Sequence, residues 1–549
     1  MTSPLPWLVL LAASASLAGP SPVTPPTVGS ANTAAADPGI ARPQTTPCRV
    51  RLFTDQPFGD YSPKAFAYAP PAGCPGRWQQ VVLEADYSIE AGRQFDRTAT
   101  LWIGGVNVYF GTTAEPSRTV ARSWHVERDL TEYAALLRST SVGRAELGNT
   151  VNGTYTSTLF GTAELVFYPA AEDEPKTADV VLPLSGSPTG GTVALFDPSA
   201  ELSATFVLPT NIEKAFLDVV LQHQGANDEF WYTCVPDDLT GPLQSCGGTA
   251  FREGQLSIDG QPAGVVPIFP WIFTGGIDPY FWRPIPAPQA LNFIPYRVDV
   301  TPYAGVLSDG KPHRFAIRVS GNSSYFQTTA TLLLYLDRDA KQVTGAVTVN
   351  TIGAPAPAIA RALTTDASGT VSGTVTTTSS RAFVLAGWVQ TSHGRVRTEI
   401  SQEIQFSNAQ QFVSPSTAPV AYVQNITQST TIASTTTRHG GGDGEARVSA
   451  TRMSWPLSVD LTIPPSASFV QVGMIRQAYN RADWSDDSSV VVSNSGEWSD
   501  TYPTRAGQAG MQRYFSSGPD GRCYSRTLTA AGGVLTSIVD GAGCDHGEE

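Results

Sequence analysis

The sequence has few charged residues and no dense cluster of basic ones. Charged residues make up 15% of its 549 positions, and the net charge is −13, with 48 acidic and 35 basic residues. Affinity for nucleic acids depends on clustered Lys and Arg, so this composition predicts no nucleic-acid partner. No run beyond the first residues is long and apolar enough to span a bilayer as a helix, so we also expect no membrane partner.

The motifs of familiar catalytic centres are missing as well. The sequence contains no GxSxG, no HExxH, no phosphate-binding glycine loop and no CxxC. Its six histidines are scattered along the chain: His125, His223, His313, His393, His439 and His546. We therefore expect no metal and no cofactor, and acidic residues are the best candidates for any catalysis.

What the sequence has in abundance favours β-structure. It carries 50 Gly and 42 Pro, with long stretches rich in Thr, Ser and Val. Such a composition gives many short strands and few amphipathic helices, so we expect an all-β protein built of sandwiches. Residues 126–137 are the one segment with a convincing helical pattern. The chain is too long for a single hydrophobic core.

Changes of composition along the chain predict its domains. A first β-sandwich is expected at residues 48–169 and a second at 178–340, and each carries a similar turn, DLTEY at 129–133 and DVTPY at 299–303. Two related sandwiches packed side by side would explain that parallel. Alternating Thr-rich segments then indicate a third, β-rich accessory domain at residues 343–517.

The N-terminus predicts secretion. Residues 6–18 form a short apolar stretch that ends in Ser16-Leu17-Ala18, which is typical of a secretory signal peptide and its cleavage site. We therefore expect a signal peptide at residues 1–18 and a secreted, extracellular protein. Residues 19–47, rich in Pro, Ala, Thr and Ser, are expected to form a disordered leader.

Six cysteines fit an oxidising compartment. Local disulfides are the favoured interpretation, because the cysteines group in pairs that bracket Pro- or Gly-rich loops: Cys48 with Cys74, Cys234 with Cys246, and Cys523 with Cys544. The last pair would staple a C-terminal tail at residues 518–549. A zinc site is the alternative, but the sequence offers no CxxC pair for it.

The most informative motif is GRQFDR at residues 92–97, followed by LWIGG at 101–105 and TAEP at 113–116. It places Asp96 between Arg93 and Arg97 at the head of an apolar run that reads as a buried strand. A carboxylate between cations at the edge of a core indicates a catalytic acid. The simpler interpretation is a structural ion pair with one of the two arginines.

Two aromatic segments also carry polar groups. Asp228 and Glu229 run directly into Phe-Trp-Tyr, and sugars stack on such aromatic surfaces, while apolar neighbours raise a carboxyl pKa. Residues 272–284 combine two glycines with Trp282 and Arg283, which could stack on and hydrogen-bond a glycan. In both segments the alternative is that the aromatic side chains fill the core. A weaker polar segment contains Glu146 and Asn149.

These blocks, together with LGN at 147–149, EFWY at 229–232 and FTGGI at 273–277, resemble the type A peptide-N-glycanases in the same order. The resemblance covers roughly residues 48–511. More distantly, the two halves look like bacterial peptide-N-glycosidase F, which implies two tandem jelly-roll-like sandwiches with the active site at their junction. It implies catalytic roles for Asp96 and Glu229, with Asp228 as the rival of Glu229. Substrate-binding roles follow for Arg97, Glu115, Glu146, Asn149, Trp231, Trp282 and Arg283.

The resemblance implies a secreted amidohydrolase that cleaves the bond between the asparagine side chain and the first N-acetylglucosamine of an N-glycan. Its partners would be N-glycosylated peptides and proteins, and we expect a monomer. Two alternatives stay open. A jelly-roll lectin would use the same aromatic side chains without turnover, and an endo-type glycoside hydrolase would cut between the two core sugars.

Overall fold

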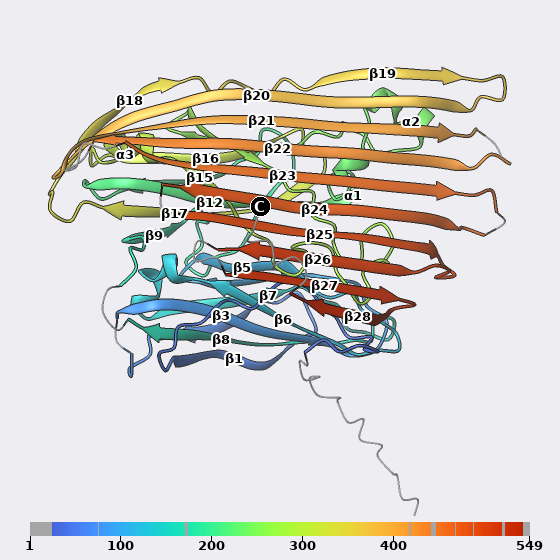
Figure 1. Ribbon diagram of the computed structural model, residues 1–549, viewed down its shortest axis with the longest axis horizontal. Coiled ribbons are helices and arrows are strands. Elements are labelled where there is room, and N and C mark those ends of the chain that lie inside the picture. Colours follow the sequence, from blue (N-terminus) through green and yellow to red (C-terminus); the bar gives the residue numbers. More distant parts are fainter. Residues whose placement is uncertain are drawn as a thin grey trace, which may run out of the picture.

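The computed structural model describes residues 25–541 except for residues 75, 171–173, 417–418, 441–445, 467, 487 and 519–521. The expected signal peptide, residues 1–18, lies outside the described residues. The described part is all-β, as predicted, and its helices are single turns of three or four residues. None of the helices among the described residues is long and apolar enough to cross a membrane. Figure 1 shows a broad C-terminal sheet, with the first sandwich at the bottom of the view.

The first sandwich is a jelly roll made of two four-stranded sheets, with strand orders β1-β8-β3-β6 and β2-β7-β4-β5. Aromatic and aliphatic side chains of both sheets, among them Trp78, Tyr87 and Phe167, form its core. The helix expected at residues 126–137 is absent: strand β6 runs to Asp129, and two turns of 3-10 helix follow. The strands are β1 (Cys48–Phe58), β2 (Lys64–Tyr68), β3 (Trp78–Ile89), β4 (Thr98–Ile103), β5 (Val106–Thr112), β6 (Arg122–Asp129), β7 (Ser141–Leu147) and β8 (Leu159–Pro169).

The second sandwich repeats this topology. One sheet has the order β10-β17-β12-β15, with β9 also paired to β17, and the other has the order β11-β16-β13-β14. The first strand of the jelly roll is thus divided into β9 and β10. The strands are β9 (Val180–Pro183), β10 (Val193–Leu195), β11 (Leu202–Val207), β12 (Ile212–Gln224), β13 (Glu253–Ile258), β14 (Gln261–Pro267), β15 (Tyr296–Asp299), β16 (Pro312–Ser320) and β17 (Tyr325–Leu336).

The C-terminal region is one 11-stranded antiparallel sheet in which β18 and β19 both pair with β20, and the strands from β20 to β28 follow one another in sequence. Buried and exposed residues alternate along its long strands, so one face is covered. That face packs on the second sandwich, because Leu385, Phe406 and Trp498 share a core cluster with it. The strands are β18 (Thr344–Asn350), β19 (Ala358–Thr365), β20 (Val371–Thr391), β21 (Gly394–Ser414), β22 (Tyr422–Gly440), β23 (Ala446–Ile463), β24 (Gln471–Ser485), β25 (Ser488–Tyr502), β26 (Ala509–Ser517), β27 (Cys523–Ala531) and β28 (Val534–Asp540).

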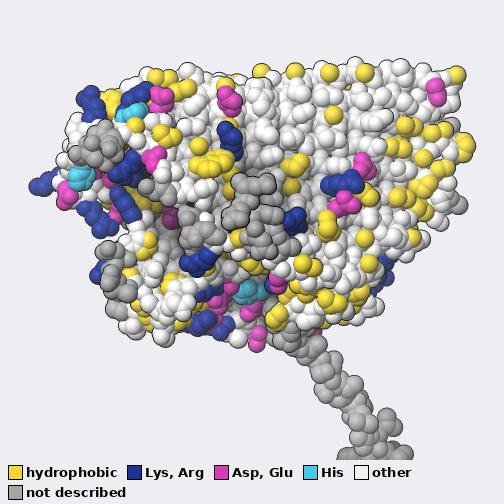
Figure 2. Space-filling view, viewed as in Figure 1, with side chains coloured by type: hydrophobic (Ala, Val, Ile, Leu, Met, Phe, Trp, Pro, Cys, Tyr) yellow, Lys and Arg dark blue, Asp and Glu magenta, His cyan; other side chains and the backbone are white. Residues whose placement is uncertain are grey.

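The opposite face of this sheet carries few charges. In Figure 2 most of it is covered by uncharged polar side chains and backbone, and charged side chains gather at the left-hand end of the view. The predicted separate tail is corrected by the structure, because β27 pairs with β26, β28 pairs with β27, and the two strands complete the sheet. The expected Cys523–Cys544 disulfide therefore does not mark a separate unit.

The leader was expected to be disordered, and the structure differs for residues 25–47. Residues 25–47 contain no helix and no strand, yet Ala34 and Ala36 are buried. Gly29 pairs with Leu535 of β28 through a backbone hydrogen bond of 2.7 Å, and Arg42 forms an ion pair with Glu127 of β6. A segment of this composition cannot build a core of its own, but here it packs on surfaces that other elements provide.

Two of the three expected disulfides are present, Cys48–Cys74 and Cys234–Cys246. The third expected bridge joins Cys523 to Cys544, and Cys544 lies outside the described residues. Peptide mapping without reduction is therefore expected to return a Cys523–Cys544 cross-link besides the other two. Recovery of Cys523 as a free thiol would contradict this pairing.

Candidate active site

A cavity of about 430 Å³ lies where the two sandwiches meet. The first sandwich contributes the start of β4, the end of β5 and the chain just before β4. The second contributes β12, β17 and the turn after β12. The lining residues are Tyr61, Asp96, Arg97, Thr98, Thr100, Phe110, Thr112, Glu146, Gly148, Thr192, Gln222, Gln224, Glu229, Phe273, Tyr325 and Gln327.

Asp96 projects into this cavity from the connection between β3 and β4. Gln94 fixes the connection, because its side-chain amide donates to the carbonyl of Thr150 at 2.9 Å and its oxygen accepts from Arg97 at 2.8 Å. The backbone N–H of Gly275 donates to the Asp96 carboxylate. Burial nevertheless dominates and raises the pKa of Asp96, against the lowering by Gly275 and by the charge of Arg97.

Gly275 must be a glycine for this contact to exist. A Cβ on Gly275 would lie 2.2 Å from Oδ1 of Asp96, far inside van der Waals contact. The same point is 3.3 Å from Oε2 of Glu115, so the Asp96 and Glu115 carboxyls lie on one side of the same backbone. The loop at residues 272–284 therefore touches both acids directly.

Glu115 lies behind Asp96 rather than on the cavity wall. It is 7% exposed, and its Oε1 accepts from Nη2 of Arg283 at 2.8 Å. Burial and the nearby charge of Asp96 raise the pKa of Glu115 well above its usual range, although Arg283 and Arg122 oppose the shift. The predicted contact of Glu115 and Arg283 with glycan is not supported by this geometry, since the two side chains neutralise each other outside the cavity lining.

Glu229 reaches the cavity from the second sandwich. It caps the C-terminus of the short helix α1 (Gly225–Asp228), which follows β12. Burial, and then the charge of Asp96, raise the pKa of Glu229 from 4.5 to about 7. Asp96 and Glu229 both line the cavity, so carboxyls from the two sandwiches meet in one space.

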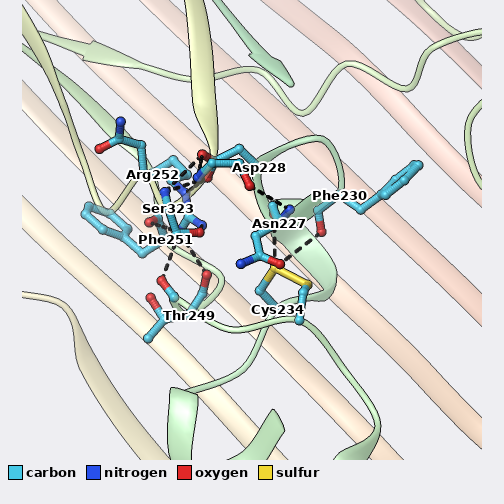
Figure 3. A network of polar contacts seen from close by, with 12 residues as sticks. Asn227, Asp228, Phe230, Cys234, Thr249, Phe251, Arg252 and Ser323 are labelled. Atoms are coloured by element: carbon cyan, nitrogen blue, oxygen red, sulfur yellow. Dashed lines mark hydrogen bonds and ion pairs between the residues drawn. A yellow bond between two sulfur atoms is a disulfide. The ribbon is translucent and has the colours of Figure 1, made fainter. Parts of the chain in front are cut away.

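Asp228 is not among the residues that line the cavity, and Figure 3 shows its carboxylate beside Arg252 and Ser323. Its Oδ1 accepts from Nε of Arg252 at 2.7 Å, and both side chains are fully buried. Its Oδ2 accepts from the backbone N–H groups of Ser323 at 2.9 Å and Ser324 at 2.6 Å. The expectation that Asp228 could rival Glu229 is therefore corrected: all its oxygens are used in holding α1 to the β16–β17 turn.

The two tryptophans expected to bind glycan are core residues. Trp231 is 1% exposed and packs against Phe406 of β21. Trp282 is 2% exposed, donates its indole N–H to the carbonyl of Gly276 and packs against Trp498 of β25. Both predictions were wrong because an aromatic beside an acid in sequence can equally fill the contact between domains.

Arg97, Glu146 and Asn149 differ in how they contribute to the cavity. Arg97 and Glu146 line it, whereas Asn149 is fully buried. The Asn149 amide donates to the carbonyl of Phe58 at 3.0 Å, and its oxygen accepts from Nε of Arg97 at 3.4 Å. Glu146 forms an ion pair with Arg144. Asn149 thus supports Arg97 and is not itself available to a substrate.

The sequence reasoning missed an uncharged polar wall of the cavity. Gln222 and Gln224 both donate to the hydroxyl of Thr98, at 2.9 Å and 3.0 Å, and thereby connect the two sandwiches. Tyr325 donates to Gln224 at 3.0 Å. A signal was present, because two glutamines spaced by two residues at the end of an apolar strand must point to the same face.

No grouping of metal ligands among the described residues falls on this cavity. The group whose donor atoms lie close together is Asp337, Asp339 and His393, and none of these residues lines the cavity. The Asp337 carboxylate already accepts from the N–H and the hydroxyl of Ser392. The polar groups that line the cavity are carboxyl, amide, guanidinium and hydroxyl groups.

Fold and site together define an all-β protein with two jelly rolls and a carboxyl-containing cavity at their junction. A family model, peptide N-acetyl-β-D-glucosaminyl asparaginase amidase A, matches residues 38–352. The chain is 33% identical over 394 residues to peptide-N4-(N-acetyl-β-glucosaminyl)asparagine amidase A of Prunus dulcis, and the match covers 67% of each protein. The chain belongs to this amidase A family, as the sequence motifs predicted.

Solved structures give more distant likenesses. PNGF-II matches over 53% of this chain and 65% of its own, with a TM-score of 0.37 and 13% identity. PNGase F, a glycosylasparaginase from Flavobacterium meningosepticum, matches over 53% of this chain and 96% of its own, with a TM-score of 0.36 and 11% identity.

Proposed function

We propose that this protein hydrolyses the amide bond between asparagine and the first N-acetylglucosamine of an N-glycan, the reaction named for its family. The observation that carries the proposal is the meeting of two carboxyls, Asp96 and Glu229, in one cavity from two separate sandwiches. Hydrolysis of an amide requires an activated water, stabilisation of the oxyanion and a proton for the leaving nitrogen. The products are a glycosylamine, which hydrolyses to the free glycan, and a peptide with aspartate in place of asparagine.

Asp96 is the group that positions or deprotonates the attacking water. It is held on one side by the Gly275 N–H and faces Arg97, whose positive charge favours the ionised carboxylate. Burial acts in the opposite direction and raises its proton affinity, which makes it a stronger base than a solvated aspartate. A fixed orientation and a raised basicity are what a general base requires.

Glu229 carries the proton that the reaction needs. With a pKa of about 7 it is about half protonated at neutral pH and largely protonated in mildly acidic solution. A protonated carboxyl can hydrogen-bond a hydroxyl of the inner sugar and assist protonation of the leaving nitrogen. Two carboxyls with different environments therefore divide the roles of base and acid.

The polar wall binds the sugar. Gln222, Gln224 and Tyr325 present amide and phenol groups that match sugar hydroxyls in both donor and acceptor capacity. Arg97 and Glu146 add charged hydrogen-bonding groups to the lining. These side chains take the place that the sequence had suggested for Trp231 and Trp282.

The protonation state of Glu229 predicts how kcat changes on the alkaline side of the pH profile. If its protonated form is required, kcat falls as the pH rises through about 7, because the acid is then lost. Glu229→Gln cannot supply a proton, so its low residual rate should show no such fall. Steady-state rates on a defined glycopeptide between pH 4 and pH 9 measure both curves, and an unchanged alkaline limb in Glu229→Gln would contradict the assignment.

Mass spectrometry of the products tests the function itself. Incubation with a glycopeptide is expected to convert asparagine to aspartate and to release the whole glycan. An endo-type glycoside hydrolase would leave one N-acetylglucosamine on asparagine, and a lectin would leave the glycopeptide intact. In heavy-oxygen water the aspartate should carry one heavy oxygen atom, because the attacking water enters the side-chain carboxylate.

Secretion belongs to the same proposal. Disulfides are typical of oxidising compartments, and the two described bridges are consistent with passage through the secretory pathway. We also propose that the protein works as a monomer on N-glycosylated peptides and proteins, because the cavity is completed by residues of one chain.

A further inference from the structure

The loop at residues 272–284 controls the geometry of the acids at the site. Its Gly275 N–H is bound to Asp96, and its Arg283 is paired with Glu115. The start of the loop is fixed to the first sandwich, since the hydroxyl of Thr274 donates to the carbonyl of Thr113 at 2.6 Å. Any displacement of the loop would therefore move the hydrogen bond that orients Asp96.

The far side of this loop rests on the C-terminal sheet. Gln508, just before β26, donates to the carbonyls of Tyr280 at 3.0 Å and of Arg283 at 2.8 Å. Gly473 of β24 lies so close to Phe281 that a Cβ there would be 2.6 Å from the ring. The sheet expected to be an accessory domain thus supports the loop that contacts the catalytic acid.

Two buried acids meet in this contact. Asp278 of the loop is 1% exposed and Asp500 of β25 is 2% exposed. Asp500 pairs in the sheet with Gly473, the residue that lies against Phe281, and the Asp278 and Asp500 carboxyls are close enough to interact. Oδ1 of Asp278 accepts from the N–H of Tyr280 at 2.9 Å. Oδ2 of Asp278 and both oxygens of Asp500 receive no hydrogen bond from an N–H or O–H of the described residues. Two carboxylates cannot hydrogen-bond without a proton between them.

We propose that Asp278 and Asp500 share one proton in the folded protein, and that this proton fastens the loop at residues 272–284 to the C-terminal sheet. The pair is a positioning device for Asp96 and not a catalytic group, because it does not line the cavity. The inference rests on the function proposed for the Asp96 site.

The charged groups that face the pair set its proton affinity. Arg283 lies on the Asp278 side and Arg505 on the Asp500 side, and both favour ionisation. The two arginines also stack on the ring of Tyr280, at 4.9 Å and 5.0 Å from its centre. Burial outweighs them and, with the charge of Asp500, raises the pKa of Asp278 from 3.8 to about 7.

The direction of the pH effect follows from this shift. Because the folded protein binds the proton more tightly than the unfolded chain, the stabilisation is complete below the ordinary aspartate pKa of about 4. It is lost as the pH rises through about 7, when both carboxyls ionise and repel each other. The contact of the Asp278 turn with the sheet is then loosened, while Phe281 and Trp282 stay in the core. The pH profiles of Glu229→Gln and of its parent are therefore compared with Asp500→Asn present in both proteins.

Hydrogen exchange of peptides spanning residues 272–284 tests the proposal at pH 5.5 and pH 8.5. After correction for the intrinsic pH dependence of amide exchange, protection of this loop in the wild type should fall about tenfold or more at the higher pH. In Asp500→Asn the amide can donate to Asp278 at every pH, so protection should stay constant. Asp278→Asn is the second variant and should behave likewise, and β3 is the internal control whose protection should not change.

Three outcomes would overturn the proposal. They are a loop protection that does not depend on pH in the wild type, a pH dependence that persists in both asparagine variants, and a loss of protection at pH 5.5 on addition of EDTA, which would mean that a cation joins the acids. The measurement requires no turnover. An Asp96→Asn protein should give the same exchange pattern, so failure of this inference and failure of the amidase proposal are distinguishable.

Discussion

Asp96→Asn is expected to lower kcat by about 100-fold or more while the protein melts at its normal temperature. The substitution keeps the size of the side chain but removes its ability to accept a proton from water. The fold should tolerate the change, because the ion pairs that stabilise this region, such as Glu115 with Arg283, do not include Asp96. Removal of the negative charge should also lower the pKa of Glu229, because the charge of Asp96 is the second cause, after burial, of its raised pKa.

Rates on a glycopeptide, together with thermal unfolding, measure this effect. Asp86→Asn is a matched control, because Asp86 lies on β3 of the same sandwich with half of its side chain exposed, and should retain nearly full activity. If Asp96→Asn keeps most of its deglycosylating rate, Asp96 is not the base. If instead it loses both rate and stability, its role is structural.

Asp228, the acid next to Glu229 in the second sandwich, should respond to substitution in the opposite way. Asp228→Asn leaves Arg252 as a buried, unpaired cation and is expected to destabilise the protein by about 3–5 kcal/mol. The new amide group would also face the N–H groups of Ser323 and Ser324, which need an acceptor. The expected result is a lower melting temperature with near-normal activity in the protein that remains folded.

A paired substitution separates this explanation from a general intolerance of the site. Asp228→Leu combined with Arg252→Met removes both charges, so it should be less destabilising than Asp228→Asn alone. If Asp228→Asn instead loses turnover without losing stability, the acid has a catalytic role after all. Thermal unfolding and rate measurements on the same preparations distinguish these cases.

Sequence reasoning succeeded where a local pattern determines the result. A composition rich in Gly, Pro, Thr, Ser and Val predicted the all-β fold, and the grouping of cysteines around Pro- or Gly-rich loops predicted the two described bridges. Asp96 and Glu229 were identified because their motifs resemble those of a family, and the structure places both on one cavity. Their chemical roles remain predictions that the substitutions above will test.

Sequence reasoning failed where the partner of a residue lies far away in the chain. Trp231 and Trp282 are buried against β21 and β25, each well over 100 positions along the sequence. Asp228 was indistinguishable from Glu229 until Arg252 and the β16–β17 turn were in place. The helical pattern after Val126 was overridden because pairing of β6 with β3 satisfies the backbone up to Asp129.

The hydrogen bond between Gly29 and Leu535 has a consequence for synthesis of the protein. The first described residues bridge the first sandwich and strand β28, so they cannot reach their final place until β28 has been synthesised. The first sandwich can form earlier, since its core is made mostly of its own residues. The support beneath residues 272–284 comes from Gly473 and Gln508, so a nascent chain released before β26 would carry an unsupported active site.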